Sequence, residues 1–230
     1  MIFFDVDETL LDFKASEYLG VKALFEMYCT HFDHNESAFY FQWCEIGKRH
    51  FTRYLSGELT FEEQKIARVK ALFGLVGLKL NDTEALAIFN VYLTHFQDNW
   101  RPFDDVIPCL KELEGLRLGV ISNGDFDQQN SKLIKMGIRD CFELVVTAGD
   151  VGVAKPDVAI FQTACGRADV SPDNCVYIGD NYVSDILPCA QIGMKGIWLN
   201  RKGIMEHRSE DVLQIQNLSE LASYLSCYYP

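Results

Sequence analysis

Two acidic residues near the start of the chain, Asp5 and Asp7, are separated by a single residue and follow a run of apolar residues. Ser122 and Asp180 follow two other apolar runs, and Lys155 lies in the loop after a further one. Carboxylates that ionise close together repel one another unless a cation lies between them. Oxygen ligands without His or Cys favour Mg²⁺, which commonly bridges to phosphate oxygens. These residue types therefore predict phosphoryl chemistry at a magnesium site.

Each of these side chains fits one part of a phosphoryl transfer. A carboxylate aligned with phosphorus can act as a nucleophile, and a second acid two residues further along can protonate the leaving oxygen and later activate water. Asp5 and Asp7 fit these two roles. Lys155 would neutralise the phosphoryl group together with Mg²⁺. Ser122 and the backbone N–H groups near Asn123 would donate hydrogen bonds to the remaining phosphoryl oxygens.

The apolar runs alternate with stretches of helical spacing in the second part of the chain. We expect strands at 1–4, 116–121, 144–147, 175–178 and 196–199, and helices at 104–113, 126–136, 157–165 and 184–192. Strands joined by single helices form parallel sheets through right-handed crossovers, so we predict an α/β fold with a three-layer, Rossmann-like parallel sheet. Polar residues that follow the strands would then meet at one edge of the sheet, where ligands bind in such folds.

The segment between the first strand and the rest of the chain has a different pattern. Its spacing predicts helices at 15–29, 36–55, 60–75 and 83–96, and Thr60 with Glu63 fits a capping box at the start of the third. We therefore expect two domains: a core formed by 1–13 and 99–230, and an inserted all-helical cap domain at 14–98. Three residues of the insert are candidates for contact with a substrate: Arg68, His50 and Arg53.

The composition argues against several classes of protein. With 21 basic and 33 acidic side chains among 230 residues, the formal charge of −12 disfavours nucleic acid or an anionic membrane as a partner. No apolar run approaches the ~20 residues of a membrane-spanning helix, and no signal peptide is recognised. None of the eight cysteines forms a CxxC pair, so buried thiols in a reducing cytosol are expected. We expect a cytoplasmic protein and leave the oligomeric state, monomer or dimer, open.

Four segments carry a resemblance to a known family. The sequence Asp5-Val6-Asp7-Glu8-Thr9 resembles the DxDx[TV] signature of the haloacid dehalogenase superfamily. Residues 120–124, 155–157 and 179–185 are similar to its second, third and fourth motifs, and all four occur in the family's order. The helical insert after the first motif resembles the cap of the subfamily that includes haloacid dehalogenases, phosphoglycolate phosphatases and several nucleotidases. The resemblance covers essentially the whole chain.

This resemblance implies a role for each motif residue. Asp5 would accept the phosphoryl group, and Asp7 would be the general acid and base. The phosphoryl group would be held by Ser122, Asn123 and Lys155. The metal ligands would be Asp5, the backbone carbonyl of Asp7, and Asp180, with Asp185 as a supporting carboxylate.

The resemblance also ranks the possible reactions. The residues of the fourth motif and the size of the insert resemble those of pyrimidine nucleoside 5′-monophosphatases and acylneuraminate 9-phosphatases. We therefore expect a small phosphate monoester as substrate, with nucleoside monophosphates ahead of sugar phosphates. A phosphomutase is the main alternative, because it shares the phosphoenzyme. A 2-haloacid dehalogenase is disfavoured, since it needs neither Mg²⁺ nor an acid at the second position. A non-catalytic binding module is disfavoured because Asp5 and Asp7 are both intact.

Overall fold

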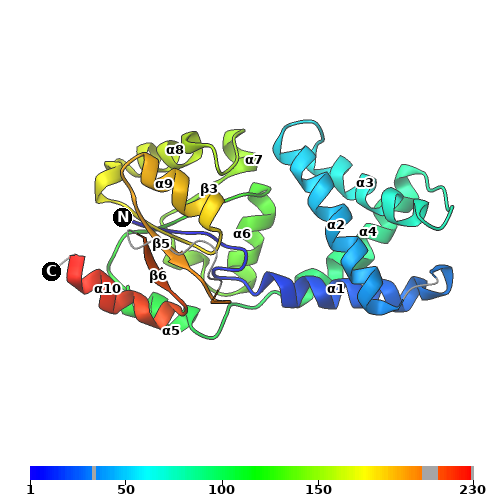
Figure 1. The fold of residues 1–230 in the computed structure, drawn as a ribbon, viewed down its shortest axis with the longest axis horizontal. Helices are drawn as coiled ribbons and strands as arrows, with labels where there is room; N and C mark the ends of the chain where they lie inside the picture. The colour runs from blue at the N-terminus through cyan, green and yellow to red at the C-terminus, as the bar shows by residue number, and fades with distance from the viewer. Residues whose placement is uncertain (33–34, 204–211, 229–230) are drawn as a thin grey trace. The chain divides into compact units, whose positions relative to one another are not determined.

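The computed structural model describes residues 1–32, 35–203 and 212–228. The chain divides into two compact units, one formed by Met1–Asp12 and Arg101–Pro230 and the other by Phe13–Trp100 (Figure 1). The boundaries predicted from the sequence, after residues 13 and 98, lie one and two residues from the observed ones. Within the described residues, no helix combines the length and apolarity that crossing a bilayer requires.

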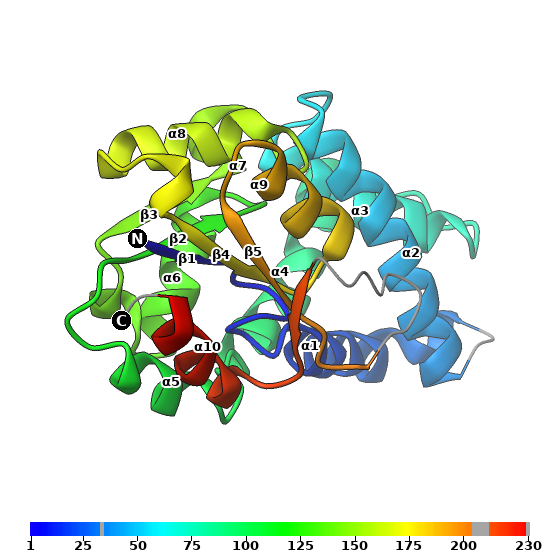
Figure 2. The ribbon, with the colours of Figure 1, turned by 60° about the vertical axis from the view of Figure 1, so that its left-hand side comes forward.

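The first unit is built on a parallel sheet, whose described strands number six and lie in the order β3-β2-β1-β4-β5-β6 (Figure 2). Their bounds are β1 Ile2–Phe4, β2 Leu118–Ser122, β3 Leu144–Thr147, β4 Val176–Gly179, β5 Lys195–Leu199 and β6 Leu213–Ile215. The residues of β1, β2 and β4 are buried, as expected for strands of a parallel sheet that is covered on both faces.

Helices cover both faces of this sheet. They are α5 Val106–Glu112, α6 Phe126–Lys135, α7 Ala148–Val151, α8 Val158–Ala168, α9 Leu187–Gln191 and α10 Leu221–Tyr228. Helices α8 and α9 lie on one face, and α5, α6 and α10 lie on the other (Figure 2). The crossovers run outward from β1 to β3 on one face and from β3 back through β4 to β5 on the other, as right-handed connections require. The predicted three-layer α/β fold is confirmed.

The strand order reverses direction between β1 and β4, and this reversal positions the site. β1 pairs with β2 on one side and with β4 on the other, so that Phe4 lies opposite both Val120 and Ile178. The polar residues that follow these strands therefore leave the sheet at its carboxyl edge, side by side. In open α/β sheets this edge, at the point of reversal, is where ligands bind.

Three features of this unit differ from the sequence prediction. The strand at 196–199 is not the last, because β6 follows it, and the segment that forms β6 is too short to show a clear period of two. Helix α7 was not predicted either; it is a single turn. The helix expected at 184–192 is two elements, a π-helical turn at Tyr182–Ile186 followed by α9.

The second unit contains the helices α1 Phe13–Tyr28, α2 Glu36–Leu55, α3 Phe61–Gly74 and α4 Asp82–Asp98. The predicted capping box is present at the start of α3, where Thr60 and Glu63 exchange hydrogen bonds. A second box, formed by Asn81 and Glu84, starts α4. Each box satisfies backbone donors that the helix itself leaves unpaired.

Aromatic side chains form much of the interior of the helical unit. Trp43 is fully buried, stacks on Phe89 with 5.9 Å between ring centroids, and also contacts Tyr92. These three rings therefore pack against one another inside the unit. The cysteines whose side chains are described are free thiols, and four of them, all in the sheet unit, are buried: Cys109, Cys165, Cys175 and Cys189.

Candidate active site

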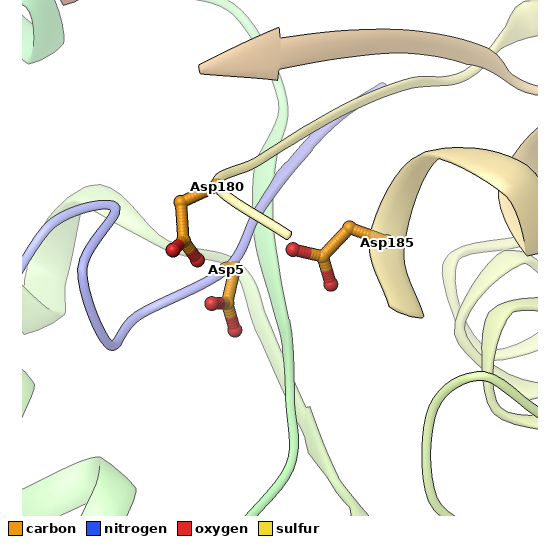
Figure 3. A group of neighbouring side chains, drawn as sticks. All are labelled: Asp5, Asp180 and Asp185. Atoms are coloured by element: carbon orange, nitrogen blue, oxygen red, sulfur yellow. The ribbon is translucent and has the colours of Figure 1, made fainter. Parts of the chain in front are cut away.

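Three carboxylates converge at the carboxyl edge of the sheet. Asp5 follows β1, Asp180 follows β4, and Asp185 lies in the π-helical turn after it. One oxygen of each lies within 4.8 Å of the others (Figure 3). The backbone N–H of Asp5 donates to the carbonyl of Ile178 at 2.9 Å, which continues the β1–β4 ladder up to the cluster. Neighbouring strands thus bring together acids that are 175 residues apart in the sequence.

Lys155 lies against two of these acids. Its Nζ donates to Asp5 Oδ1 at 2.8 Å, to Asp185 Oδ1 at 2.7 Å and to the hydroxyl of Tyr177 at 2.8 Å. The side chain of Asn123 fixes the lysine backbone, because it accepts from the N–H of Lys155 and donates to its carbonyl, both at 2.8 Å. Asn123 was predicted as a phosphate-binding residue, and that role stays a prediction; its side chain holds the backbone of Lys155 in place.

Burial and mutual repulsion act strongly on the carboxylates. Burial raises the pKa of Asp5 to about 6; Lys155 opposes this rise, and the charges of Asp185 and Asp7 add to it. Burial, together with the charges of Asp5 and Asp185, raises the pKa of Asp180 to about 8. Burial alone would lower the pKa of Lys155, but the two carboxylates that it contacts raise it above its usual value. The single positive charge of Lys155 therefore does not balance the carboxylates of Asp5, Asp180 and Asp185.

The cluster fits a hard divalent cation. Its donors are carboxylate oxygens close enough together to share one ion, and such donors suit Mg²⁺. A bound cation would also favour the ionised forms of Asp5 and Asp180, which burial disfavours.

The position of Asp185 depends on two neighbours that the fourth motif supplies. A Cβ added to Gly179 would lie 2.3 Å from Asp185 Oδ2, so the glycine leaves the space that this carboxylate occupies. The backbone N–H of Asn181 donates to the same oxygen at 3.0 Å. The side chain of Asn181 accepts from the N–H groups of Val183 and Ser184 and so caps the π-helical turn. Asp185 itself is fully buried and bonded to Lys155, as suits a supporting role.

On the other side of Asp5, helix α6 supplies two residues that were not predicted. Gln129 Nε2 donates to Ser122 Oγ at 3.0 Å and to Asp7 Oδ2 at 3.1 Å. Lys132 Nζ donates to both oxygens of Asp7, at 2.6 and 2.8 Å. Ser122 is buried and accepts from Gln129, which leaves its own proton to donate elsewhere. In the sequence these two residues stand in a polar run, 127–132, and nothing in their spacing distinguishes them from their neighbours.

A family model described as haloacid dehalogenase-like hydrolase matches residues 1–193. The chain belongs to the haloacid dehalogenase-like hydrolase family. The four ordered motifs therefore identified the family correctly.

Curated relatives of this haloacid dehalogenase-like hydrolase include proteins named as phosphatases. The chain is 37% identical over 133 residues to a glyceraldehyde 3-phosphate phosphatase of Methanothermobacter thermautotrophicus, covering 54% of this chain and 59% of that protein. It is 29% identical to the pyrimidine 5′-nucleotidase YjjG of Escherichia coli, over 86% of this chain and 85% of YjjG. It is 26% identical to human N-acylneuraminate-9-phosphatase, over 97% and 92% of the two chains. The predicted similarity to the last two kinds of enzyme is confirmed.

Solved structures support the fold of this haloacid dehalogenase-like hydrolase. The HAD-hydrolase YfnB of Bacillus subtilis, solved with bound magnesium, superposes with a TM-score of 0.77 over 97% of each chain, at 24% identity. A 2-haloacid dehalogenase of Pseudomonas syringae pv. Tomato superposes with a TM-score of 0.74 at 26% identity, over 99% of this chain and 98% of that one. The same fold thus carries both a magnesium-bound hydrolase and a dehalogenase.

In the helical unit of this hydrolase, Arg68 is occupied by the unit's own interior. Its guanidinium donates to Glu17 at 3.0 Å and lies over the ring of Trp43 at 4.1 Å. A Cβ on Gly47 would lie 2.4 Å from the Arg68 guanidinium carbon, so this glycine makes room for the arginine. Arg68 and Glu17 are each 11% exposed as side chains. These contacts give Arg68 a structural explanation.

His50 and Arg53 lie together one turn apart on α2. Arg53 forms an ion pair with Glu58 at 2.7 Å, and its guanidinium lies 3.4 Å from His50 Nδ1. Burial lowers the pKa of His50, and the charge of Arg53 lowers it further. A substrate role for His50, Arg53 or Arg68 stays a prediction.

Proposed function

We propose that this chain is a Mg²⁺-dependent phosphatase that hydrolyses a small phosphate monoester through an aspartyl-phosphate on Asp5. The observation that carries the proposal is the cluster of Asp5, Asp180 and Asp185 around one point, with the Lys155 ammonium 2.8 Å from the Asp5 carboxylate. This combination of a cation site, a lysine and a carboxylate nucleophile suits an anion of high charge, such as a phosphoryl group.

In the first step, a carboxylate oxygen of Asp5 attacks phosphorus and the ester P–O bond breaks. Asp7 gives its proton to the leaving oxygen, so that the product departs as an alcohol. Lys155 and the Ser122 hydroxyl contact phosphoryl oxygens and neutralise or hydrogen-bond the charge that they carry. Asn123 holds Lys155 in place for this contact.

In the second step, Asp7, now ionised, takes a proton from water, and the water oxygen attacks phosphorus. The bond between phosphorus and Asp5 breaks, phosphate leaves, and Asp5 is regenerated as a carboxylate. Asp7 therefore acts first as an acid and then as a base, which requires its carboxyl group to remain in one place through both steps.

Asp5, Asp180 and the backbone carbonyl of Asp7 would hold Mg²⁺, with Asp185 as a supporting carboxylate. When bound, the ion neutralises charge on the phosphoryl oxygens and on the cluster itself. We expect Ca²⁺ to bind but to support turnover poorly, since its looser and higher coordination misplaces the nucleophile.

The proposed substrate is a nucleoside monophosphate, followed by sugar phosphates. Support comes from the relatives that align over most of their length, a pyrimidine nucleotidase and an acylneuraminate phosphatase. We propose that the helical unit is a cap that contributes this selectivity, and that the protein acts on a cytoplasmic metabolite. A phosphomutase remains the runner-up, because it would use the same phosphoenzyme.

The test is hydrolysis by the purified protein of a panel of phosphorylated metabolites with Mg²⁺. Chloride release from 2-chloropropionate is measured alongside, because structural neighbours include a haloacid dehalogenase. We expect phosphate release that chelation of Mg²⁺ abolishes, inhibition by BeF₃⁻ with Mg²⁺, and no chloride release. If no nucleotide ranks among the best substrates, the nucleotidase assignment is wrong. Metal-independent chloride release would replace the phosphatase proposal with a dehalogenase.

A further inference from the structure

Lys132 and Gln129 of helix α6 donate hydrogen bonds to the side chain of Asp7. The proposed reaction has so far given these two residues no role. We propose that Lys132 and Gln129 are positioning residues that fix the Asp7 carboxylate for proton transfer to the leaving oxygen and from water. This inference rests on the proposed function, in which Asp7 is the acid and base.

The hydrogen bonds that hold the Asp7 side chain come from its buried side. The Lys132 side chain is 1% exposed, whereas that of Asp7 is 28% exposed. Lys132 Nζ donates to both Asp7 oxygens, at 2.6 and 2.8 Å. A buried ammonium is costly unless it is paired, and two bonds to one carboxylate restrict rotation of that carboxylate. The exposed side of Asp7 is left to face a substrate.

Gln129 links Asp7 to Ser122 at the end of β2. Its Nε2 donates at once to Asp7 Oδ2, at 3.1 Å, and to Ser122 Oγ, at 3.0 Å. Within the described part of the chain, Asp7 Oδ2 therefore accepts from two side chains and Oδ1 from one. Oδ1 has more capacity left for a further hydrogen bond, so we assign the transferred proton to Oδ1.

Local geometry supports the same arrangement independently. A Cβ on Gly124 would lie 2.6 Å from Gln129 Nε2, so the glycine keeps open the space in which the amide lies. The Asp125 side chain accepts from the backbone N–H of Gln128 at 3.0 Å and sets the start of α6. Residues three apart on a helix share a face, and this start directs Gln129 and Lys132 together toward Asp7.

The test compares Lys132→Met and Gln129→Leu with Lys135→Met, a matched loss of charge at an exposed position on the same helix. Two probes are used with Mg²⁺: phenyl phosphate, with a poor leaving group, and p-nitrophenyl phosphate, with a good one. For Lys132→Met we expect kcat/KM on phenyl phosphate to fall about 10²-fold, within the range for general acid catalysis. The initial burst of nitrophenolate should fall far less, and the phosphoenzyme should then hydrolyse slowly. Gln129→Leu should show the same pattern more weakly, and Lys135→Met should behave as the wild type.

Two further measurements separate positioning from a merely structural role. Lys132→Arg should recover part of the loss, because a guanidinium can also donate to both carboxylate oxygens. In a double-mutant cycle, Lys132→Met should slow Asp7→Asn little further, since Lys132 acts through Asp7. The positioning role would be overturned if kcat/KM on phenyl phosphate and the nitrophenolate burst fell by the same factor. It would also be overturned if the effects of Lys132→Met and Asp7→Asn multiplied in the double mutant.

Failure of this inference can be told apart from failure of the proposed function. If the wild type hydrolyses neither these probes nor any phosphorylated metabolite of the panel, or Asp5→Asn retains its activity, both proposals are wrong. If hydrolysis depends on Asp5 while Lys132→Met and Gln129→Leu keep the wild-type ratio of rates on the two probes, only the positioning role is wrong. Circular dichroism checks the fold of each variant, and where Lys132→Met does not fold, Gln129→Leu and Gly124→Ala carry the same test.

Discussion

In each unit of the molecule a lysine or arginine with little exposed side chain lies beside a carboxylate, and the two sites differ in how their charges balance. In the helical unit, Arg68 pairs with Glu17 and lies over Trp43. In the sheet unit, Lys155 contacts Asp5 and Asp185, and the side chain of Asp180 adds further negative charge.

This difference separates a structural ion pair from a functional one. At the first site the charges of Arg68 and Glu17 match in number, and an aromatic ring lies over the guanidinium. The acidic site is unfavourable until a cation binds, and such imbalance is typical of sites that do chemistry. For Arg68 and Lys155, the number of acids around each cation therefore distinguishes the two sites.

The largest effect should come from Asp5→Asn. An amide is a poor nucleophile and a weaker metal ligand, so turnover should fall by about 10⁴-fold or more, as for loss of a nucleophile in other enzymes. The metal-free variant should be at least as stable as the wild type at pH 8, because one buried negative charge is gone while Lys155 keeps Asp185. Steady-state rates and thermal unfolding measure the two quantities, with the exposed Asp104→Asn as control. Near-normal turnover would rule out the covalent mechanism.

The opposite result is expected for Arg68→Met in the helical unit. Removing one partner leaves Glu17 buried and unpaired, which should destabilise the protein by about 3–5 kcal/mol. Urea unfolding measures this loss, and Arg49→Met on the exposed face of α2 is the control. The folded fraction should hydrolyse p-nitrophenyl phosphate with little change in KM. Unchanged stability together with a raised KM would instead make Arg68 a substrate-binding residue.

The imbalance at the acidic site should also appear as a dependence of stability on pH. The folded pKa of Asp180 is about 8, above its ordinary value of 3.8, so the folded state holds a proton that the unfolded state releases between these values. Without metal, the free energy of unfolding should therefore fall as pH rises from about 4 to about 8, by on the order of a few kcal/mol.

Mg²⁺ should remove most of this fall, because it stabilises the ionised carboxylates. Urea titrations at several pH values, with Mg²⁺ and with EDTA, measure the effect, and Asp180→Asn should flatten the metal-free curve. If Mg²⁺ stabilised the wild type equally at pH 5 and pH 8, the cluster would not be its binding site.

The smallest effect in this series concerns neither buried site. Thr60→Ala removes the cap of α3 and should cost about 1 kcal/mol. Thr83→Ala, at an exposed position in the first turn of α4, should stay within about 0.5 kcal/mol of the wild type. Thermal unfolding of both variants shows how much stability an exposed hydrogen bond contributes, for comparison with the Arg68–Glu17 pair. If Thr60→Ala lowered the free energy of unfolding as much as Arg68→Met, the loss in Arg68→Met could not be attributed to an unpaired buried charge.

Local signals in the sequence were enough to predict most of the elements. Helix α2 has the predicted bounds, Glu36–Leu55, and β3 has those predicted for it, Leu144–Thr147. The capping pair Thr60 and Glu63 is present because it depends on residues three apart. The strands before Asp5 and Asp180 were recognised because apolar runs ending in polar residues are typical of a parallel sheet.

Contacts that depend on tertiary packing were not predictable in the same way. Lys132 was assigned no role because a lysine on a helix is usually solvated, and its burial depends on how α6 packs beside Asp7. The pairing of Arg68 with Glu17, 51 residues away, likewise required the packing of separate helices. β6 is an edge strand of three residues, and its identity depends on pairing with β5.

The π-helical turn at Tyr182–Ile186 makes the direction of the Asp185 side chain depend on the number of residues in this segment. A π turn holds one residue more than an α turn, so deleting the exposed Val183 would convert it to ordinary helix. Asp185 would then turn by about 100° relative to Asp180 and lose its direction toward Lys155. A one-residue deletion here should thus cost more than one in the exposed connection between α3 and α4, although both sites lie at the surface.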